Sequence, residues 1–172
     1  MKRPEKTRLN IPYKSQLDNA ENPTGSCNVT AIATCLNFFG IKRKTLAQLE
    51  DEIYRRMLDE GLSRHSPEDL AKMVRAYGLK DDFTAGGTFD RCKDHLAAGN
   101  PCVIHGYFTS FGHIITLVGY DSKGFIVHDP YGEWHSDGYD TSASGAYLHY
   151  SYDLIRRTSA HDGQFWVHYI SK

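Results

Sequence analysis

The sequence predicts an α+β protein, because helical and extended patterns occupy different halves of the chain. Up to about residue 98, apolar residues recur with helical spacing, and glycines stand where the predicted helices end. From residue 101 onward, short runs of β-branched and aromatic residues alternate with turn-forming residues, as in "HIITLVGYD" (113–121). Helices followed by antiparallel strands are typical of the α+β class.

Four helices are predicted, and the first three have clear start or stop signals. The first opens on a cysteine and is followed by Gly40, a residue suited to the turn after a helix. Thr45 and Gln48 have the spacing of a capping box for the second helix. Ser66-Pro67 supplies an N-cap serine and a first-turn proline for the third. The predicted helices span residues 27–39, 46–60, 67–77 and about 89–98.

The extended runs predict five strands, at residues 11–16, 101–108, 113–121, 124–130 and 164–170. The short loop within "YDSKGF" joins the third and fourth of them as a hairpin. No repeat, linker or low-complexity tract divides the chain. We therefore expect one domain over residues 1–172, with residues 1–10 as a flexible arm.

Composition excludes several classes of function. The 172 residues carry a net charge of −1 without a block of like charges, so we expect neither nucleic acid nor anionic lipid as a partner. No apolar run is long enough to span a membrane, and no apolar signal segment follows the basic first residues, which predicts a cytoplasmic location. The sequence does not indicate an oligomeric state.

A cysteine at the start of a buried helix is the first candidate for chemistry. The stretch "ENPTGSCNVTAIATCLNFFG" (21–40) places Cys27 where a polar loop meets an apolar helix. The unpaired N–H groups of a helix start favour an anion, and the thiolate is the nucleophilic form of cysteine. Cys35, Cys92 and Cys102 lie in apolar surroundings, as small buried hydrophobic residues do. The alternative is that Cys27 is also an inert buried thiol.

Three further residues could complete a site around a thiol. His113 opens an apolar strand, and Asp129 ends the next one, so the hairpin brings them close together. A carboxylate beside an imidazole fixes its tautomer and supports its cationic form. Gln16 has an amide N–H suited to a developing oxyanion. Taken singly, these residues could be a core histidine, a turn residue and a surface glutamine.

The order of these residues resembles the C39-like cysteine peptidases of the papain-like superfamily. The resemblance covers residues 11–130, and its most specific part is "GHIITLVGYD" (112–121) followed by a strand that ends in Asp-Pro. It implies a papain-like fold, in which helices with the catalytic cysteine at a helix start pack on an antiparallel sheet. It also implies an amide hydrolase that needs no cofactor.

The resemblance assigns a role to each residue of the set. Cys27 is the expected nucleophile, His113 the base, Asp129 the orienting residue and Gln16 the oxyanion donor. The family often has Gly-Pro after its cysteine, whereas Asn28-Val29 stands here, which changes the wall beside the thiol. The substrate-binding residues that we expect are Asn28, Gly112, Tyr131 and Trp134, the last two as a lid over the histidine and aspartate.

The sequence thus predicts a cysteine peptidase that acts on a peptide or on the stem peptide of peptidoglycan, as a phage-type lysin does. An acyltransferase with the same residues and an inactive peptide-binding module are the alternatives. The segment "HDPYGEWH" (128–135) could also suggest a metal site, with His128, Asp129, Glu133 and His135 as ligands. No HExxH or comparable ligand spacing supports a metal there.

Overall fold

The computed structural model describes residues 3–108 and 112–172 and confirms the predicted α+β class. A sheet of antiparallel strands has the order β2-β9-β3-β4-β5-β8, and β1 pairs with the far end of β4. The strands of this sheet are β1 (Thr7–Arg8), β2 (Lys80–Thr84), β3 (Cys102–Gly106), β4 (His113–Tyr120), β5 (Gly124–His128), β8 (Leu148–Ser151) and β9 (Val167–Ser171). A separate hairpin consists of β6 (Glu133–His135) and β7 (Gly138–Asp140).

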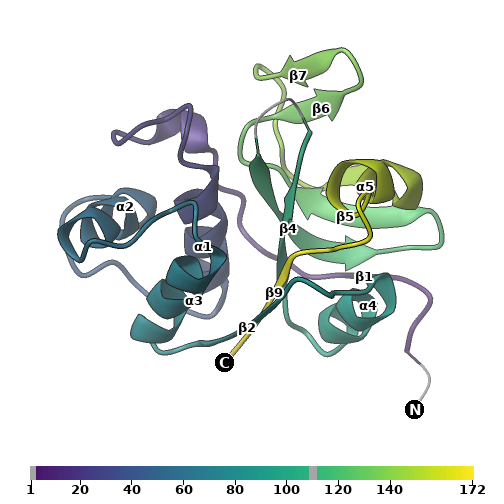
Figure 1. The fold of residues 1–172 in the computed structure, drawn as a ribbon, viewed down its shortest axis with the longest axis horizontal. Helices are drawn as coiled ribbons and strands as arrows, with labels where there is room; N and C mark the ends of the chain where they lie inside the picture. The colour runs from purple at the N-terminus through teal and green to yellow at the C-terminus, as the bar shows by residue number, and fades with distance from the viewer. Residues whose placement is uncertain (1–2, 109–111) are drawn as a thin grey trace.

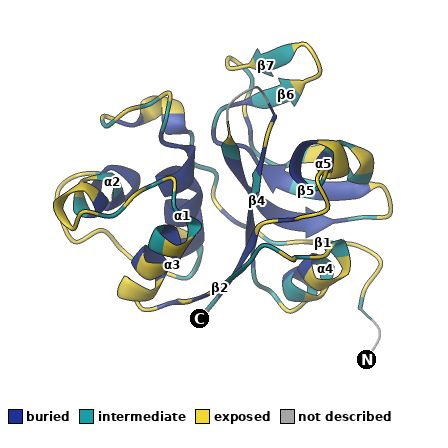
Figure 2. Cartoon of the chain, in the orientation of Figure 1, coloured by how far each residue is buried: buried dark blue, intermediate teal, exposed yellow. Residues whose placement is uncertain are grey.

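Helices cover the sheet from both sides, as Figure 1 shows. The helices are α1 (Cys27–Phe38), α2 (Leu49–Asp59), α3 (Pro67–Ala76), α4 (Phe89–Ala97) and α5 (Tyr152–Ser159), and a 3-10 turn covers Gln16–Asp18. One apolar core joins α1, α2 and α3 to Val103, Ile114 and Ile170 of the sheet. A second core lies under α4 and α5 around Ile104 and Leu117. The buried strands between these two cores are visible in Figure 2.

Helix α1 is buried almost all round, and this position fixes the place of its first residue. Its residues from Cys27 to Leu36 are all buried, and Val29, Ile32 and Leu36 are fully so. Burial of such side chains contributes roughly 1.5–3 kcal/mol each. Gly40 then takes the positive φ of 82° that a helix end often requires. The start of α1 therefore lies rigidly against the end of the sheet where β4 begins.

Two predicted elements differ in the structure: one strand is absent, and one helix begins later than predicted. Residues 11–15 form no strand: the N–H of Ile11 bonds the Tyr147 hydroxyl and the N–H of Gln16 bonds the Pro130 carbonyl, so this segment crosses between loops. Helix α2 begins at Leu49 rather than at residue 46. The Glu52 carboxylate accepts the N–H groups of residues 44 and 45, both at 2.6 Å, and this holds the preceding residues in a loop.

The prediction that residues 1–10 form a flexible arm is wrong for the residues that the structure describes. Arg3 forms ion pairs with Asp90 and Asp94 of α4, and β1 (Thr7–Arg8) pairs with Tyr120 and Gly119. The described part of residues 1–10 therefore extends the fold. Within the described residues, no helix is long and apolar enough to cross a membrane.

Candidate active site

Cys27 is the first residue of α1, and a hydrogen-bonded loop holds it there. Asn19 donates to the hydroxyls of Ser26 and Thr30, both at 2.9 Å, and Ser26 is the fully buried N-cap residue. Cys27 keeps 9% of its surface exposed, whereas Cys35, Cys92 and Cys102 are fully buried. Of the four cysteines, the one at the helix start is thus the one that is not completely buried, and it lines a cleft.

His113 and Asp129 meet, as the hairpin between their strands predicted. The last paired residues of β4 and β5 are Thr116 and His128, so Asp129 follows directly after the strand end. His113 Nε2 lies 2.7 Å from Asp129 Oδ1, with 10% of the histidine side chain and none of the aspartate side chain exposed. Since Nε2 is engaged, Nδ1 is the ring nitrogen available to Cys27.

The charges around His113 favour its protonated form. Burial lowers the pKa of His113, but the Asp129 carboxylate and then the Cys27 thiolate raise it by more, so that it reaches about 10. A hydrogen bond with each of these two partners acts in the same direction. An imidazolium between a thiolate and a carboxylate is the arrangement that keeps a thiol ionised and ready to attack.

Asp129 is held by two tyrosines that the sequence did not single out. The hydroxyls of Tyr139 and Tyr150 donate to Oδ2 at 2.9 and 2.8 Å, and the N–H of Tyr131 donates to Oδ1 at 3.1 Å. Burial and the neighbouring carboxylate raise the pKa of both tyrosines far above the ordinary value, so the hydroxyls stay protonated donors. Tyr139 comes from the β6–β7 hairpin, and nothing in its local pattern indicated this contact.

Gln16 is buried and tied to the turn that carries Asp129. Its backbone N–H donates to the Pro130 carbonyl at 2.9 Å, and its side-chain Nε2 donates to the Pro23 carbonyl at 3.0 Å. One amide hydrogen remains for another acceptor. Oε1 is buried and has no partner among the described residues. Gln16 is therefore tied to the turn after Asp129, has one donor and one acceptor unused among the described residues, and is not among the described residues that line the cleft of Cys27 and His113.

Of the four predicted substrate-binding residues, two line the cleft, one packs on His113 and one lies elsewhere. Asn28 and Gly112 line the same cleft as Cys27 and His113. Tyr131 packs against the His113 ring, with centroids 6.2 Å apart. Trp134 instead packs against Phe108 and donates its indole N–H to the Phe108 carbonyl. The prediction that Trp134 covers His113 is therefore wrong, and Tyr139, with its ring centroid 5.5 Å from that of His113, lies beside the histidine instead.

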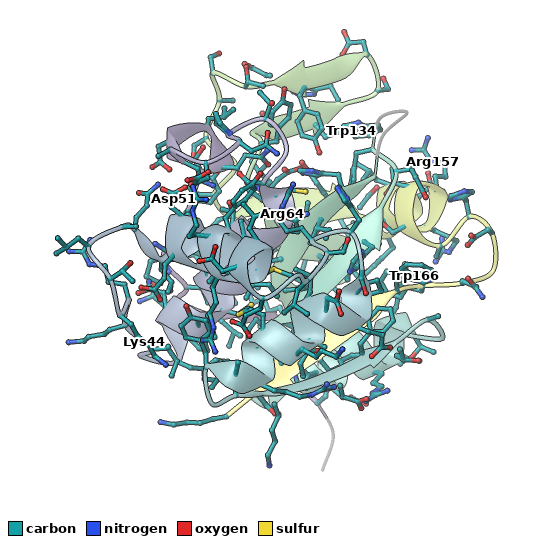
Figure 3. All side chains as sticks on the ribbon, turned by 60° about the vertical axis from the view of Figure 1, so that its left-hand side comes forward. Lys44, Asp51, Arg64, Trp134, Arg157 and Trp166 are labelled. Atoms are coloured by element: carbon teal, nitrogen blue, oxygen red, sulfur yellow. The ribbon has the colours of Figure 1, made fainter. Side chains whose placement is uncertain are left out.

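The cleft that contains Cys27 and His113 has a volume of about 640 Å³. Its lining includes Arg64 from the loop between α2 and α3, His105 from β3, and Trp166, the residue before β9. Arg64 and Trp166 are labelled in Figure 3. A larger hollow of about 830 Å³ lies along α2 near Lys44 and Asp51, without Cys27 or His113. The smaller cleft is therefore the one that a substrate of the thiol would occupy.

The side chains of "HDPYGEWH" do not converge on one point. His128 is buried. Its Nε2 is hydrogen-bonded to the Ile11 carbonyl, and its Nδ1 accepts the Tyr147 N–H. Glu133 and His135 face each other on the exposed hairpin. Among the described residues, no group of three histidine, cysteine, aspartate or glutamate side chains is placed to share a metal ion.

An antiparallel sheet with a cysteine at the start of a buried helix is the fold expected of a papain-like cysteine peptidase. The model of the Peptidase_C39 like family matches residues 8–160, and the chain belongs to that family. The chain is similar in fold to a C39-like peptidase from Bacillus anthracis, described as putative, at 16% identity and a TM-score of 0.66, over 96% of this chain and 98% of the other.

A second solved structure has the same fold. It is a double glycine motif protease from an AMS/PCAT transporter in complex with its leader peptide, at 19% identity and a TM-score of 0.57, over 94% of this chain and 91% of the other. No curated protein sequence matches the chain. The family assignment makes the protein a cysteine peptidase, and both structures agree with its fold.

Proposed function

We propose that Cys27, His113 and Asp129 form the catalytic triad with which this peptidase hydrolyses an amide bond. The observation that carries the proposal is the 2.7 Å contact between His113 and Asp129 beside the accessible cysteine at the start of α1. Asp129 fixes the tautomer of His113 and stabilises its positive charge. His113 in turn stabilises the Cys27 thiolate.

The reaction proceeds through a thioester. The Cys27 sulfur attacks the substrate carbonyl carbon, and the negative charge moves to the carbonyl oxygen. The backbone N–H of Cys27 and the free amide hydrogen of Gln16 are the proposed donors to that oxygen. His113 gives its proton to the leaving amine as the carbon–nitrogen bond breaks. Water then attacks the thioester, His113 takes its proton, and the acid leaves while the thiolate returns.

We propose a peptide as substrate. One structure similar to this chain is a protease in complex with a leader peptide, which supports a peptide in the corresponding cleft here. The cleft volume of about 640 Å³ accommodates a few residues of an extended chain. The stem peptide of peptidoglycan is the second candidate substrate. The cytoplasmic location stays a prediction for cell fractionation to test.

The test compares wild-type protein with Cys27→Ala on a peptide library and on purified peptidoglycan sacculi. Mass spectrometry identifies the cleaved bond. Wild type is expected to release new amino and carboxyl termini, and Cys27→Ala to release none. Addition of an amine nucleophile separates hydrolysis from acyl transfer, because transfer leaves the amine on the product. Equal cleavage by both proteins would refute the assignment of the nucleophile.

A further inference from the structure

A second group of titratable side chains crosses the sheet below α1 and α3. It contains Asp81 from β2, His168 from β9 and His105 from β3. His168 lies opposite Phe83 on one side and Val103 on the other, so Asp81 and His105 are its diagonal neighbours, two residues along each strand. Diagonal neighbours on one face of a sheet are within reach of long side chains.

The three side chains form a hydrogen-bonded chain. His168 Nδ1 lies 3.0 and 2.9 Å from the two carboxylate oxygens of Asp81. His168 Nε2 lies 2.9 Å from His105 Nε2. The side chains of Asp81 and His168 are completely buried, and His105 is half-buried. None of the three contacts Asp129 or belongs to the triad.

The direction of the hydrogen bonds follows from the burial of the Asp81 carboxylate. Among the described residues, His168 is the only ion-pair partner of the Asp81 carboxylate. A buried carboxylate oxygen needs a donor, so the hydrogen between His168 Nδ1 and Asp81 belongs to the histidine. With His168 Nε2 as the donor to His105 Nε2, His105 carries its own hydrogen on Nδ1. Burial and the charge of His168 lower the pKa of His105 to about 3, in agreement with a neutral ring.

His105 reaches the substrate cleft close to the reacting atoms. It lines the same cleft as Cys27, and its cross-strand partner is Ile114, the residue after His113. His105 therefore lines the cleft of Cys27 from the strand next to the one that begins at His113.

Basic side chains outnumber acidic ones in this cleft. Besides the two histidines already placed, its lining includes Arg64, His65 and His161, against a single carboxylate, Asp162. One guanidinium N–H of Arg64 donates to the Gly25 carbonyl at 2.8 Å, which holds the positive charge near the loop that precedes Cys27. Arg64 is the residue of this described lining with a permanent positive charge, and a negatively charged group is attracted to it.

We propose that His105, oriented by His168 and Asp81, is a specificity-determining residue that binds a carboxylate of the substrate in the cleft of Cys27. Arg64 supplies the long-range attraction. The carboxylate belongs either to an acidic side chain or to the free C-terminus of a peptide. The inference rests on the proposed function, since it takes the cleft at Cys27 as the peptide site.

Binding to the Cys27→Ala protein tests the inference without turnover. The peptides of one set are blocked at both ends, and each has a single glutamate whose position differs from peptide to peptide. Each is compared with the same peptide carrying glutamine in place of the glutamate. The other set compares a free C-terminal carboxylate with its amide. At least one acidic peptide is expected to bind about tenfold more tightly than its neutral partner. The set in which this occurs identifies the source of the carboxylate.

The residue is tested by adding His105→Ala to that protein, with His149→Ala as the matched control on the exposed end of β8. His105→Ala is expected to remove the preference, and His149→Ala to keep it. Should His105→Ala fail to fold, the nitrogen NMR shift of His105 Nδ1 during titration gives the same answer. A preference that survives His105→Ala, an unchanged Nδ1 shift, or no preference up to about 5 mM peptide would overturn the inference.

Hydrolysis of the same peptides by the wild-type protein is measured separately. If the preference is found but no peptide is cleaved, the proposed function fails and the binding site stands. If peptides are cleaved without any acidic preference, the proposed function stands and the role of His105 is wrong.

Discussion

Replacement of Asp129 by asparagine should narrow the active pH range from its alkaline side. Only protonated His113 can give a proton to the leaving amine, so activity falls as the pH rises through the pKa of His113, about 10. The asparagine retains an acceptor for the ring but removes a negative charge 2.7 Å away. Loss of an opposite charge at this distance lowers such a pKa by about 1–3, or roughly 1.4–4 kcal/mol. The alkaline limit should therefore move to about pH 7–9.

The measurement is kcat/KM for a cleaved peptide from about pH 5 to pH 11. Asp162→Asn is the matched control, because it removes a carboxylate from the same cleft without contact to His113. Its alkaline limit should stay with that of wild type. The reasoning is refuted if Asp129→Asn and wild type have the same alkaline limit, because the charge of Asp129 would then have no effect on the pKa of His113.

Three further predictions concern the oxyanion, the backbone and the class of catalysis. Gln16→Ala should lower kcat by about 10²–10³ with little change in KM, and unchanged kcat would remove Gln16 from the site. Gly145→Ala should reduce activity, because the new Cβ would lie 1.8 Å from the Asp129 carbonyl oxygen. Gly86→Ala should leave activity unchanged, because the atom nearest to its new Cβ is 3.7 Å away. Equal rates in the two variants would contradict this prediction. EDTA should leave peptide cleavage unchanged while iodoacetamide abolishes it, and loss to EDTA with recovery on zinc would contradict thiol catalysis.

Local signals predicted the elements that carry the site. The loop-to-helix change before Cys27 and the hairpin between His113 and Asp129 depend on neighbouring residues, so the sequence showed both. The same holds for α3, whose Ser66 cap accepts the N–H of Asp69 as its pattern indicated. These features need no knowledge of distant contacts.

The features that the sequence missed depend on contacts between distant residues. β2 forms only because residues 80–84 pair with β9 at the other end of the chain. Residues 11–15 look extended, but their partners are loop groups such as Tyr147 and Pro130 rather than a strand. Tyr139 reaches Asp129 because the β6–β7 hairpin folds back over the strand end. No local pattern encodes such an approach.

The reactivity of Cys27 tests the proposed triad most directly. Because Cys35, Cys92 and Cys102 are fully buried, the informative comparison is the same cysteine in wild type and in His113→Gln. Brief iodoacetamide treatment at about pH 6, followed by peptide mapping, measures its rate. An ordinary thiol is only about 0.3% ionised at that pH.

An ion pair with His113 should make Cys27 roughly ten to a hundred times more reactive in wild type than in the variant, after allowance for the lower nucleophilicity of a stabilised thiolate. Equal alkylation rates in the two proteins, or no labelling of Cys27 in either, would mean that the thiol at the start of α1 is structural and that the proposed triad is wrong.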